Sequence, residues 1–385
     1  MRKLKLRFEE CCSLFVLFIA YIVSLPLRRK NVWLVSERGD DARDNGYWFF
    51  RYMQEEHPEV ESFFIIDIKS KDYQKLEKYR ANLIQPNSFK HYMFIWISSY
   101  HISTHVTGYA PYCRRFYQKM HSKYKIFGSR KQIFLQHGII KDAMPQFYYE
   151  ETHLDMFVCG AKYEYEFVKD TFHYPHNEVR YTGLCRYDGL LDFKTKPQIL
   201  IMPTWRQYIS KEKSEFEKSS YFLHYKNLLT DPRLWQLARD VNVDIIFYPH
   251  YEIQKFIDLF KNLELPLNIK IADFNYDVQQ LLKESLMLIT DFSSVYFDMC
   301  YMNKPVLLYQ FDEEEYRAEH YPIGYLDVRK IGLRSETLDE LIRDLKFTID
   351  SGFVVHEKYK EYIDGMFEMR DKKNCERVYQ NILIL

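Results

Sequence analysis

The stretch LMLITDFSS, residues 286–294, is the clearest indication of how this chain folds. The apolar residues 286–289, together with Thr290, predict a buried strand, and the polar residues that follow lead into an expected helix at 294–302. Apolar strands also run into polar residues at 132–138 (QIFLQHG) and at 243–250 (VDIIFYPH). In open α/β sheets, ligands bind beyond the carboxyl ends of the strands. These stretches therefore predict functional side chains at strand ends.

Strands and helices alternate on both sides of an expected linker at 190–198. This alternation predicts parallel sheets, and 385 residues exceed one ordinary core. We therefore expect an α/β fold with two doubly wound parallel-sheet domains facing a cleft, at 31–190 and 191–350, and C-terminal helices within 351–385. The expected strands lie at 31–36, 62–67, 83–84, 101–105, 132–136, 155–160, 179–183, 198–203, 243–248, 269–272, 286–290 and 305–309, and the last expected helices at 335–349 and 357–385.

The N-terminal segment, residues 1–30, has a different composition. Residues 11–27 (CCSLFVLFIAYIVSLPL) are almost wholly apolar, whereas a full membrane span usually takes ~20 such residues. We predict a monotopic or short signal-anchor helix on the anionic cytoplasmic face of the membrane. A cleaved signal peptide and a buried structural helix are the alternatives, although no small-x-small cleavage site follows. Basic residues flank the apolar run: Arg2, Lys3, Lys5, Arg7, Arg28, Arg29 and Lys30.

Charge and cysteine content exclude several classes of protein. Lys+Arg and Asp+Glu number 54 each, so bulk charge does not indicate a nucleic-acid partner. The seven cysteines form no C-x-x-C pair, which argues against a zinc site or a disulfide framework and fits reduced thiols in the cytosol. A homo-oligomer stays open.

Two histidines follow apolar strands and are the candidate catalytic residues. His137, next to Gly138, has the chemistry to take a proton near neutral pH. His250 is suited to hold a phosphate or to stabilise charge as a bond breaks. A hydrogen-bonded structural role is the alternative for each. His101 and His105 are expected to be structural.

The TDFSS turn is the sharpest candidate for anion binding. Backbone N–H groups at a helix start attract anions, and the hydroxyls of Ser293 and Ser294 add donors beside Asp291. Ordinary helix capping is the alternative.

Further candidates for phosphate or substrate binding are Thr204, Arg206, Arg186 and Asp188. Arginine matches phosphate with two parallel donors, and a surface salt bridge is the alternative for Arg206. Both interpretations are open for Arg186 and Asp188. The acidic stretch 312–315 is expected to be a solvated loop rather than a magnesium site, with a carboxylate that accepts polyol hydroxyls as a further alternative.

Taken in order, the motifs resemble those of the CDP-glycerol glycerophosphotransferases of teichoic-acid and capsule synthesis. The resemblance covers roughly residues 32 to 345. Leu-Gln before His137 and Leu-Cys before Arg186 depart from the common family pattern. The motifs are Glu37-Arg38-Gly39 with Asp44-Asn45-Gly46, Gln136-His137-Gly138, Gly183-x-x-Arg186-x-Asp188, Pro203-Thr204-Trp205-Arg206, Pro249-His250, Thr290-Asp291-Phe292-Ser293-Ser294 and Lys304-Pro305-Val306.

The resemblance implies a GT-B architecture and a membrane-associated cytoplasmic enzyme. It implies transfer of glycerol phosphate from CDP-glycerol to a hydroxyl of a lipid-linked glycan or polyol-phosphate acceptor, with release of CMP. It places His137 at the proposed base, His250 at a second essential histidine, and Asp291, Ser293 and Ser294 at the donor's pyrophosphate. No metal or other cofactor is expected.

Four other functions stay open. The first two are ribitol phosphate transfer from CDP-ribitol and sugar transfer by a GT-B glycosyltransferase that uses a sugar nucleotide. The others are a metal-dependent phosphohydrolase and a non-catalytic membrane scaffold.

Overall fold

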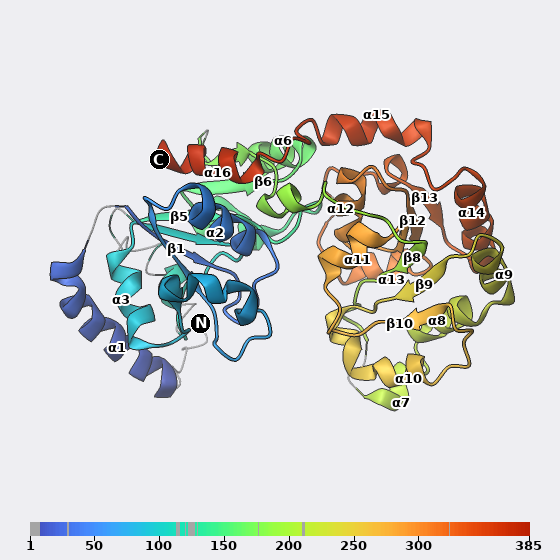
Figure 1. The fold of residues 1–385 in the computed structure, drawn as a ribbon, viewed down its shortest axis with the longest axis horizontal. Helices are drawn as coiled ribbons and strands as arrows, with labels where there is room; N and C mark the ends of the chain where they lie inside the picture. The colour runs from blue at the N-terminus through green and yellow to red at the C-terminus, as the bar shows by residue number, and fades with distance from the viewer. Residues whose placement is uncertain are drawn as a thin grey trace. The chain divides into compact units, whose positions relative to one another are not determined.

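The computed structural model describes residues 8–28, 31–112, 116–119, 121, 128, 130–175, 177–209, 212–322 and 324–385. The chain divides into two compact units (Figure 1). Unit 1 comprises Met1–Ile139, Met144–Gly189 and Asp371–Leu385, and unit 2 comprises Ile140–Ala143 and Leu190–Arg370. The expected C-terminal segment 351–385 is thus shared between the units.

Unit 1 is built on a seven-stranded parallel sheet with the order β3-β2-β1-β4-β5-β6-β7. Its strands are short and largely buried, as in parallel sheets that are covered on both faces. The strands are β1 Val32–Ser36, β2 Glu61–Ile65, β3 Leu83–Ile84, β4 Tyr100–Ser103, β5 Lys131–Phe134, β6 Met156–Cys159 and β7 Val179–Tyr181. The helices and 3-10 segments are α1 Phe8–Ser24, η1 Leu25–Leu27, α2 Asn45–Glu56, η2 Tyr73–Asn82, α3 Phe89–Ile97, η3 Pro145–Phe147, α5 Tyr149–Thr152, α6 Lys162–Thr171, η4 Cys185–Gly189 and α16 Asn374–Leu383.

Unit 2 contains a six-stranded parallel sheet with the order β10-β9-β8-β11-β12-β13. The strands are β8 Gln198–Ile201, β9 Asp244–Phe247, β10 Ile269–Ile271, β11 Met287–Thr290, β12 Val306–Tyr309 and β13 Leu333–Ser335. The helices and 3-10 segments are α7 Lys213–Phe216, α8 Ser220–Thr230, α9 Pro232–Asp240, η5 Tyr251–Phe256, α10 Ile257–Lys261, α11 Val278–Glu284, α12 Val295–Tyr301, α13 Glu313–Ala318, η6 Val328–Lys330, α14 Leu338–Asp350 and α15 Glu357–Met366.

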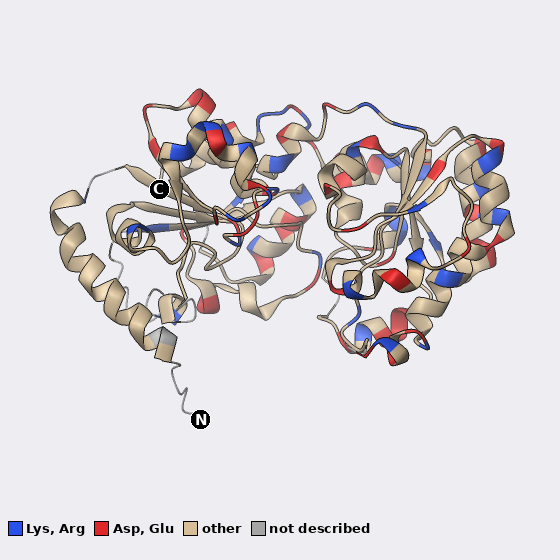
Figure 2. Cartoon of the chain, turned by 60° about the horizontal axis from the view of Figure 1, so that its bottom comes forward, with Lys and Arg blue, Asp and Glu red and all other residues tan. Residues whose placement is uncertain are grey.

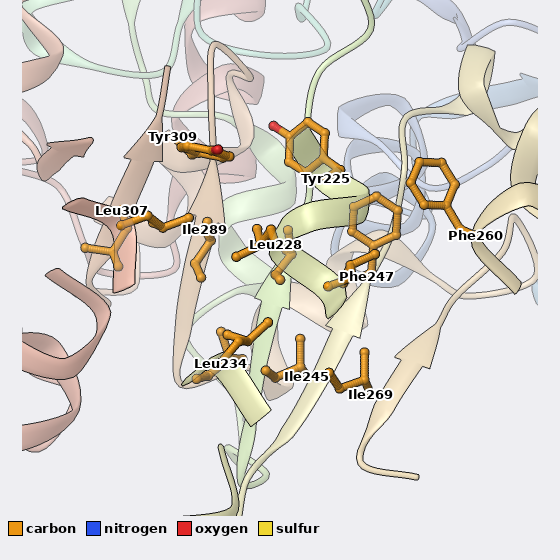
Figure 3. Packing of buried hydrophobic residues seen from close by; sticks show 14 of the residues in the cluster. Tyr225, Leu228, Leu234, Ile245, Phe247, Phe260, Ile269, Ile289, Leu307 and Tyr309 are labelled. Atoms are coloured by element: carbon orange, nitrogen blue, oxygen red, sulfur yellow. The ribbon is translucent and has the colours of Figure 1, made fainter. Parts of the chain in front are cut away.

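The core of unit 2 lies between this sheet and its helices. Figure 3 shows Tyr225 and Leu228 of α8 packed with Phe247 of β9 and Ile289 of β11, all of which are buried. Two parallel-sheet domains are the class that we expected, and this expectation is confirmed.

Two local expectations were wrong. The helix expected from residue 335 begins only at Leu338, because residues 333–335 form β13 and Thr337 makes a capping box with Glu340. The single helix expected at 357–385 is two helices. The chain turns between α15 and α16, with Lys372 in the left-handed region at φ 59°.

The N-terminal helix α1 packs on α3 in unit 1. Trp96 Nε1 donates to Leu17 O at 3.0 Å, and the hydroxyls of Ser13 and Tyr92 lie 2.5 Å apart. Figure 2 shows that α1 carries no charged residue beyond its first turn. Within the described residues, no helix combines the length and apolar character that a membrane crossing requires. The flanking residues Arg2, Lys3, Lys5, Arg7, Arg29 and Lys30 lie outside the described residues.

Candidate functional site

A strained turn after β5 places His137 at the carboxyl end of the sheet of unit 1. Gln136 adopts φ 60°, a conformation that costs free energy and persists only when the surroundings enforce it. Its Nε2 donates to Glu164 Oε1 at 3.1 Å and to Val158 O, and its own carbonyl accepts from Asn45 Nδ2 at 2.8 Å. The backbone that carries His137 is therefore held from three elements, β6, α6 and α2.

The hydrogen bonds of His137 leave one ring nitrogen as a base. Nδ1 lies 3.2 Å from Thr104 O, and because a carbonyl only accepts, Nδ1 carries the proton in the neutral ring. Nε2 then has the free lone pair. Desolvation lowers the pKa of His137, with the Asp44 carboxylate opposing it, although the residue is exposed at the surface. The neutral, proton-accepting form is therefore favoured at neutral pH.

His105, which we expected to be structural, lies against His137. The two rings stack with centroids 4.7 Å apart and planes 2° apart. His105 Nε2 accepts from Arg38 Nε at 3.3 Å, and its Nδ1 lies 3.0 Å from Thr104 Oγ1. The sequence could have predicted this contact, because one of the two expected strands ends in a histidine and the other is followed by one, and strands β4 and β5 are neighbours in the sheet.

Arg186 fixes the same turn from η4. Its Nη1 donates to Asp44 Oδ1 at 3.0 Å and to His137 O at 3.1 Å, and its backbone N–H donates to Asn45 Oδ1 at 2.9 Å. Burial raises the pKa of Asp44, and the charges of Arg186 and His137 act against that rise. These contacts are those of a residue that positions His137. Direct contact between Arg186 and substrate stays a prediction.

Asp188 is engaged at the start of the C-terminal helix. Its carboxylate accepts from the backbone N–H groups of Asn374 at 2.8 Å and Cys375 at 2.9 Å, and from Asn374 Nδ2 at 2.7 Å. An anion that accepts the first N–H groups of a helix stabilises that terminus. In this arrangement Asp188 fastens α16 to unit 1, and its predicted contact with substrate stays untested.

In unit 2, Asp291 joins the PTWR and TDFSS turns. It is fully buried. Its Oδ1 accepts from the backbone of Thr204 at 2.8 Å and of Phe292 at 2.6 Å, while Oδ2 lies 2.8 Å from Arg206 Nη1 and 3.2 Å from Tyr225 Oη. Its carboxylate is therefore occupied by protein groups.

Arg206 lies in the interior rather than on the surface. Its Nε and Nη2 donate to Asp312 at 2.7 and 2.9 Å, and Nη1 also donates to Thr204 O at 2.8 Å. Burial opposes the charge, but Asp291 and Asp312 raise the pKa of Arg206 well above its ordinary value. The solvated loop expected at 312–315 was wrong for Asp312, which is buried because Arg206 requires a paired carboxylate. Residues 313–315 begin α13.

Three hydroxyls around this turn have little or no engagement with the protein. Ser294 precedes α12 but makes no side-chain capping bond, and Ser293 Oγ accepts only a long 3.5 Å bond from Val295 N. Thr204 Oγ1 is buried without a hydrogen-bond partner among the described residues. Simple capping therefore does not account for Ser294, and the hydroxyls suit an anionic ligand.

His250 follows β9 and begins η5. Its Nδ1 accepts from Glu252 N at 3.2 Å, so the neutral ring carries its proton on Nε2. Pro249 O accepts from Gln254 Nε2 at 2.9 Å and holds the backbone beside it. The Nε2 of His250 is thus a donor, whereas that of His137 is an acceptor.

The described residues group no metal ligands and pair no cysteines. Among the described residues, no three or more His, Cys, Asp or Glu side chains are grouped to hold a metal ion. Cys11, Cys12, Cys159, Cys185, Cys300 and Cys375 are free thiols, and Cys113 lies outside the described part of the chain.

Comparison with known proteins gives a family and two relatives. The profile of the family described as CDP-glycerol:poly(glycerophosphate) glycerophosphotransferase matches residues 17–384. The minor teichoic acid biosynthesis protein GgaB of Bacillus subtilis (strain 168) is 33% identical over 371 residues, covering 93% of this chain and 40% of that protein. A teichoic acid poly(glycerol phosphate) polymerase of the same strain is 22% identical over 390 residues, covering 93% and 49%. The chain therefore spans less than half the length of these relatives.

A solved structure shares the fold. The wall teichoic acid polymerase TagF matches with a TM-score of 0.64 at 16% identity, covering 98% of each chain. At this identity the likeness concerns the fold alone.

Proposed function

Since the chain belongs to the CDP-glycerol:poly(glycerophosphate) glycerophosphotransferase family, we propose that it transfers glycerol phosphate from CDP-glycerol to an acceptor hydroxyl and releases CMP. The acceptor class is a lipid-linked glycan or a polyol-phosphate polymer, as in teichoic-acid or capsule synthesis. The observation that carries the proposal is that two strand-end histidines use Nδ1 in opposite ways, since that of His137 faces a carbonyl oxygen and that of His250 accepts from a backbone N–H. His137 offers a free Nε2 lone pair, and His250 offers an Nε2 proton.

The reaction follows from these two roles. The acceptor oxygen attacks the phosphorus that bears glycerol and gives its proton to His137 Nε2. A new bond forms between this oxygen and phosphorus, while the bond from phosphorus to the bridging oxygen breaks. CMP leaves with that oxygen, and the Nε2–H of His250 and the hydroxyls of Ser293, Ser294 and Thr204 stabilise the negative charge on the phosphates. His105 and Arg186 act as positioning residues for His137.

Asp291 and Arg206 support this turn without touching the donor in our proposal. Asp291 holds both turns by their backbone N–H groups, and Arg206 with Asp312 fixes Asp291 in turn. We therefore propose that these two residues position the turns, in place of the direct phosphate binding that we expected from the sequence.

Release of nucleotide from a donor panel tests the function. The full chain is incubated with an acceptor and CDP-glycerol, CDP-ribitol or a UDP-sugar, and the released nucleotide is identified. We expect CMP from CDP-glycerol, and loss of ~10²-fold or more in turnover for His137→Ala, the usual scale for a general base. Release of CMP from CDP-ribitol alone would show ribitol phosphate transfer instead. Release of UDP from a UDP-sugar would show a glycosyltransferase.

The matched control is His356→Ala. His356 belongs to none of the turns that carry the candidate residues, and its side chain caps α15 in unit 2. Turnover near that of the wild type in a folded His137→Ala or His250→Ala protein would remove that residue from the reaction.

We also propose that α1 rests on the cytoplasmic face of the membrane and keeps the enzyme beside a lipid-linked acceptor. One side of α1 packs on α3 through Leu17 and Ala20, while Phe15, Phe18 and Ile22 are 66%, 61% and 51% exposed. A helix with an exposed apolar side of this kind suits burial in the interface of a bilayer, parallel to its plane.

A further inference from the structure

Lys141 and Arg317 share a single carboxylate in unit 2. Lys141 Nζ lies 2.5 Å from Asp142 Oδ2, and Arg317 Nη1 lies 3.3 Å from Asp142 Oδ1. The three side chains are 11%, 20% and 14% exposed for Lys141, Arg317 and Asp142, so they are largely withdrawn from water but remain reachable. The segment is held in unit 2 by Ala143 N, which donates to Pro322 O at 3.1 Å.

The charges of this cluster do not balance. Lys141 and Arg317 bring two positive charges and Asp142 one negative charge. Glu313 lies 3.7 Å from Arg317 Nε but only 2.5 Å from Arg334 Nη2, which it pairs more closely. Partly buried charge is unfavourable unless it is paired, and burial lowers the pKa of Lys141 while Asp142 opposes this effect. The charge of Asp291 also acts on Lys141, but Asp291 is itself paired with Arg206, so an added anion beside Lys141 and Arg317 would be stabilised.

The cluster lies at the TDFSS turn. Phe292 of this turn stacks on Tyr316 with centroids 3.8 Å apart, and Tyr316 stacks on His320 at 3.6 Å. Arg317 follows Tyr316 directly on α13, and the charge of Asp291 acts on Lys141. Arg317 is thus next in sequence to a ring that stacks on the TDFSS turn, and Asp142 joins Lys141 to Arg317.

Tyr296 carries a buried hydroxyl on which the charge of Asp142 acts. Tyr296 is fully buried, and its hydroxyl has no hydrogen-bond partner among the described residues. Burial and then the charge of Asp142 raise the pKa of Tyr296 well above its ordinary value, so the hydroxyl stays protonated and can donate.

We propose that Lys141 and Arg317 supply the cationic contacts for the phosphate groups of the donor, the role first expected of Arg206. This inference rests on the proposed function, because the anion it places there is the diphosphate of a nucleotide-linked donor. Arginine binds phosphate through paired donors and lysine through a compact point charge. Arg206, by contrast, is bonded to protein through all three of its nitrogens.

Calorimetric titration of the full chain with CDP and with inorganic pyrophosphate tests the inference. We expect wild-type protein to bind both ligands, and Lys141→Met and Arg317→Gln each to weaken both by roughly ten- to a hundredfold, the scale of a lost charged hydrogen bond. The KM for CDP-glycerol should rise in the same variants, and Lys141→Arg should recover much of the binding. The control is Lys346→Met, a 62% exposed residue of α14 in the same unit, which should bind as the wild type does.

The two proposals fail in different ways. If Lys141→Met and Arg317→Gln bind CDP and pyrophosphate as tightly as the wild type does, the proposed role of these cations is overturned. This holds even if CMP is still released from CDP-glycerol. Wild-type protein that binds neither ligand overturns it too. Binding that depends on Lys141 and Arg317 in a protein that releases no CMP from CDP-glycerol supports this inference and contradicts the proposed function. Circular dichroism of each variant checks that it is folded, and Lys141→Arg separates loss of charge from loss of structure.

Discussion

The charge of Asp44 acts on His137, and Arg186 donates hydrogen bonds to both residues. The Asp44 carboxylate favours the imidazolium form, whereas desolvation favours the neutral ring and has the larger effect, so the pKa of His137 lies below its ordinary value. A base with a lowered pKa remains neutral, and therefore able to accept a proton, at pH values where an ordinary histidine would be charged. The local surroundings thus tune the residue toward proton acceptance.

The pH dependence of kcat/KM tests this tuning. Activity that needs neutral His137 is present above the folded pKa and is lost as pH falls through it. We therefore expect the acid limb of the profile to have its midpoint below 6.5, the ordinary histidine value. Asp44→Asn removes the charge that favours the imidazolium, so this limb should move to still lower pH. The control Glu77→Gln, on the exposed part of η2, should leave the midpoint unchanged; an upward shift in Asp44→Asn would contradict the assignment.

The buried ion pairs of Arg206 predict a large loss of stability on substitution. Arg206→Leu leaves Asp291 and Asp312 without their cation, and breaking a buried pair typically costs about 3–5 kcal/mol. Arg329→Leu is the control, since its pair with Asp327 is exposed and such pairs are worth about 0–1 kcal/mol. Urea denaturation of both variants measures the difference in the free energy of unfolding. Similar midpoints for the two would show that the interior network contributes little.

At the scale of secondary-structure elements, the sequence predicted strands better than the contacts around them. Apolar runs such as 286–290 and 198–203 became β11 and β8 because burial on both faces of a parallel sheet requires continuous apolar residues. The positions of His137 and His250 at strand ends followed from the same pattern. The partners could not be predicted in this way. Arg206 pairs with Asp312, which lies over a hundred residues away in the sequence, and spacing along a strand carries no record of such a pair.

The end of the chain shows a second limit of sequence reasoning. Residues 357–385 have helical composition, yet the chain bends before Asn374 so that Asp188 caps α16. Gly183 permits this docking because it has φ 78°, and a Cβ built there would lie 1.8 Å from Asn374 Oδ1. The requirement comes from a contact between distant segments, which composition does not reveal.

Comparison of Gly183 with Gly352, which lies in unit 2, separates the conformational cost of a side chain at Gly183 from its packing cost. Gly183 and Gly352 have nearly the same φ, 78° and 77°, but a Cβ on Gly352 would meet nothing within 4 Å. Gly352→Ala should therefore cost only the left-handed conformation, about 1–2 kcal/mol. Gly183→Ala should cost about 1–3 kcal/mol more, because Asn374 must move. Denaturant unfolding measures both, and equal losses would contradict the proposed role of the contact.

At the scale of the whole molecule, the chain begins in unit 1 and returns to it twice, at Met144 and at Asp371. Unit 1 is completed only by residues 371–385, and unit 2 includes the short segment Ile140–Ala143 from the N-terminal half. The core of unit 1 therefore includes buried residues of α16 such as Val378 and Ile382. Neither unit is a continuous stretch of sequence, so the linker expected at 190–198 was not sufficient to describe the division of the chain.

The apolar side of α1 predicts binding to lipid vesicles by the intact protein. Full burial of one large apolar side chain is worth about 1.5–3 kcal/mol, so Phe15→Ser and Phe18→Ser should each reduce partitioning into vesicles by roughly tenfold or more. Their exposure means that they make few contacts within unit 1, and the fold should tolerate both changes. Phe347→Ser, at an exposed position on α14 of unit 2, is the matched control and should not change partitioning. Co-sedimentation with vesicles of phosphatidylglycerol and phosphatidylcholine measures the effect. Equal sedimentation of wild type and both α1 variants would show that this side of the helix does not contact lipid, and the attachment to the membrane would then need another origin.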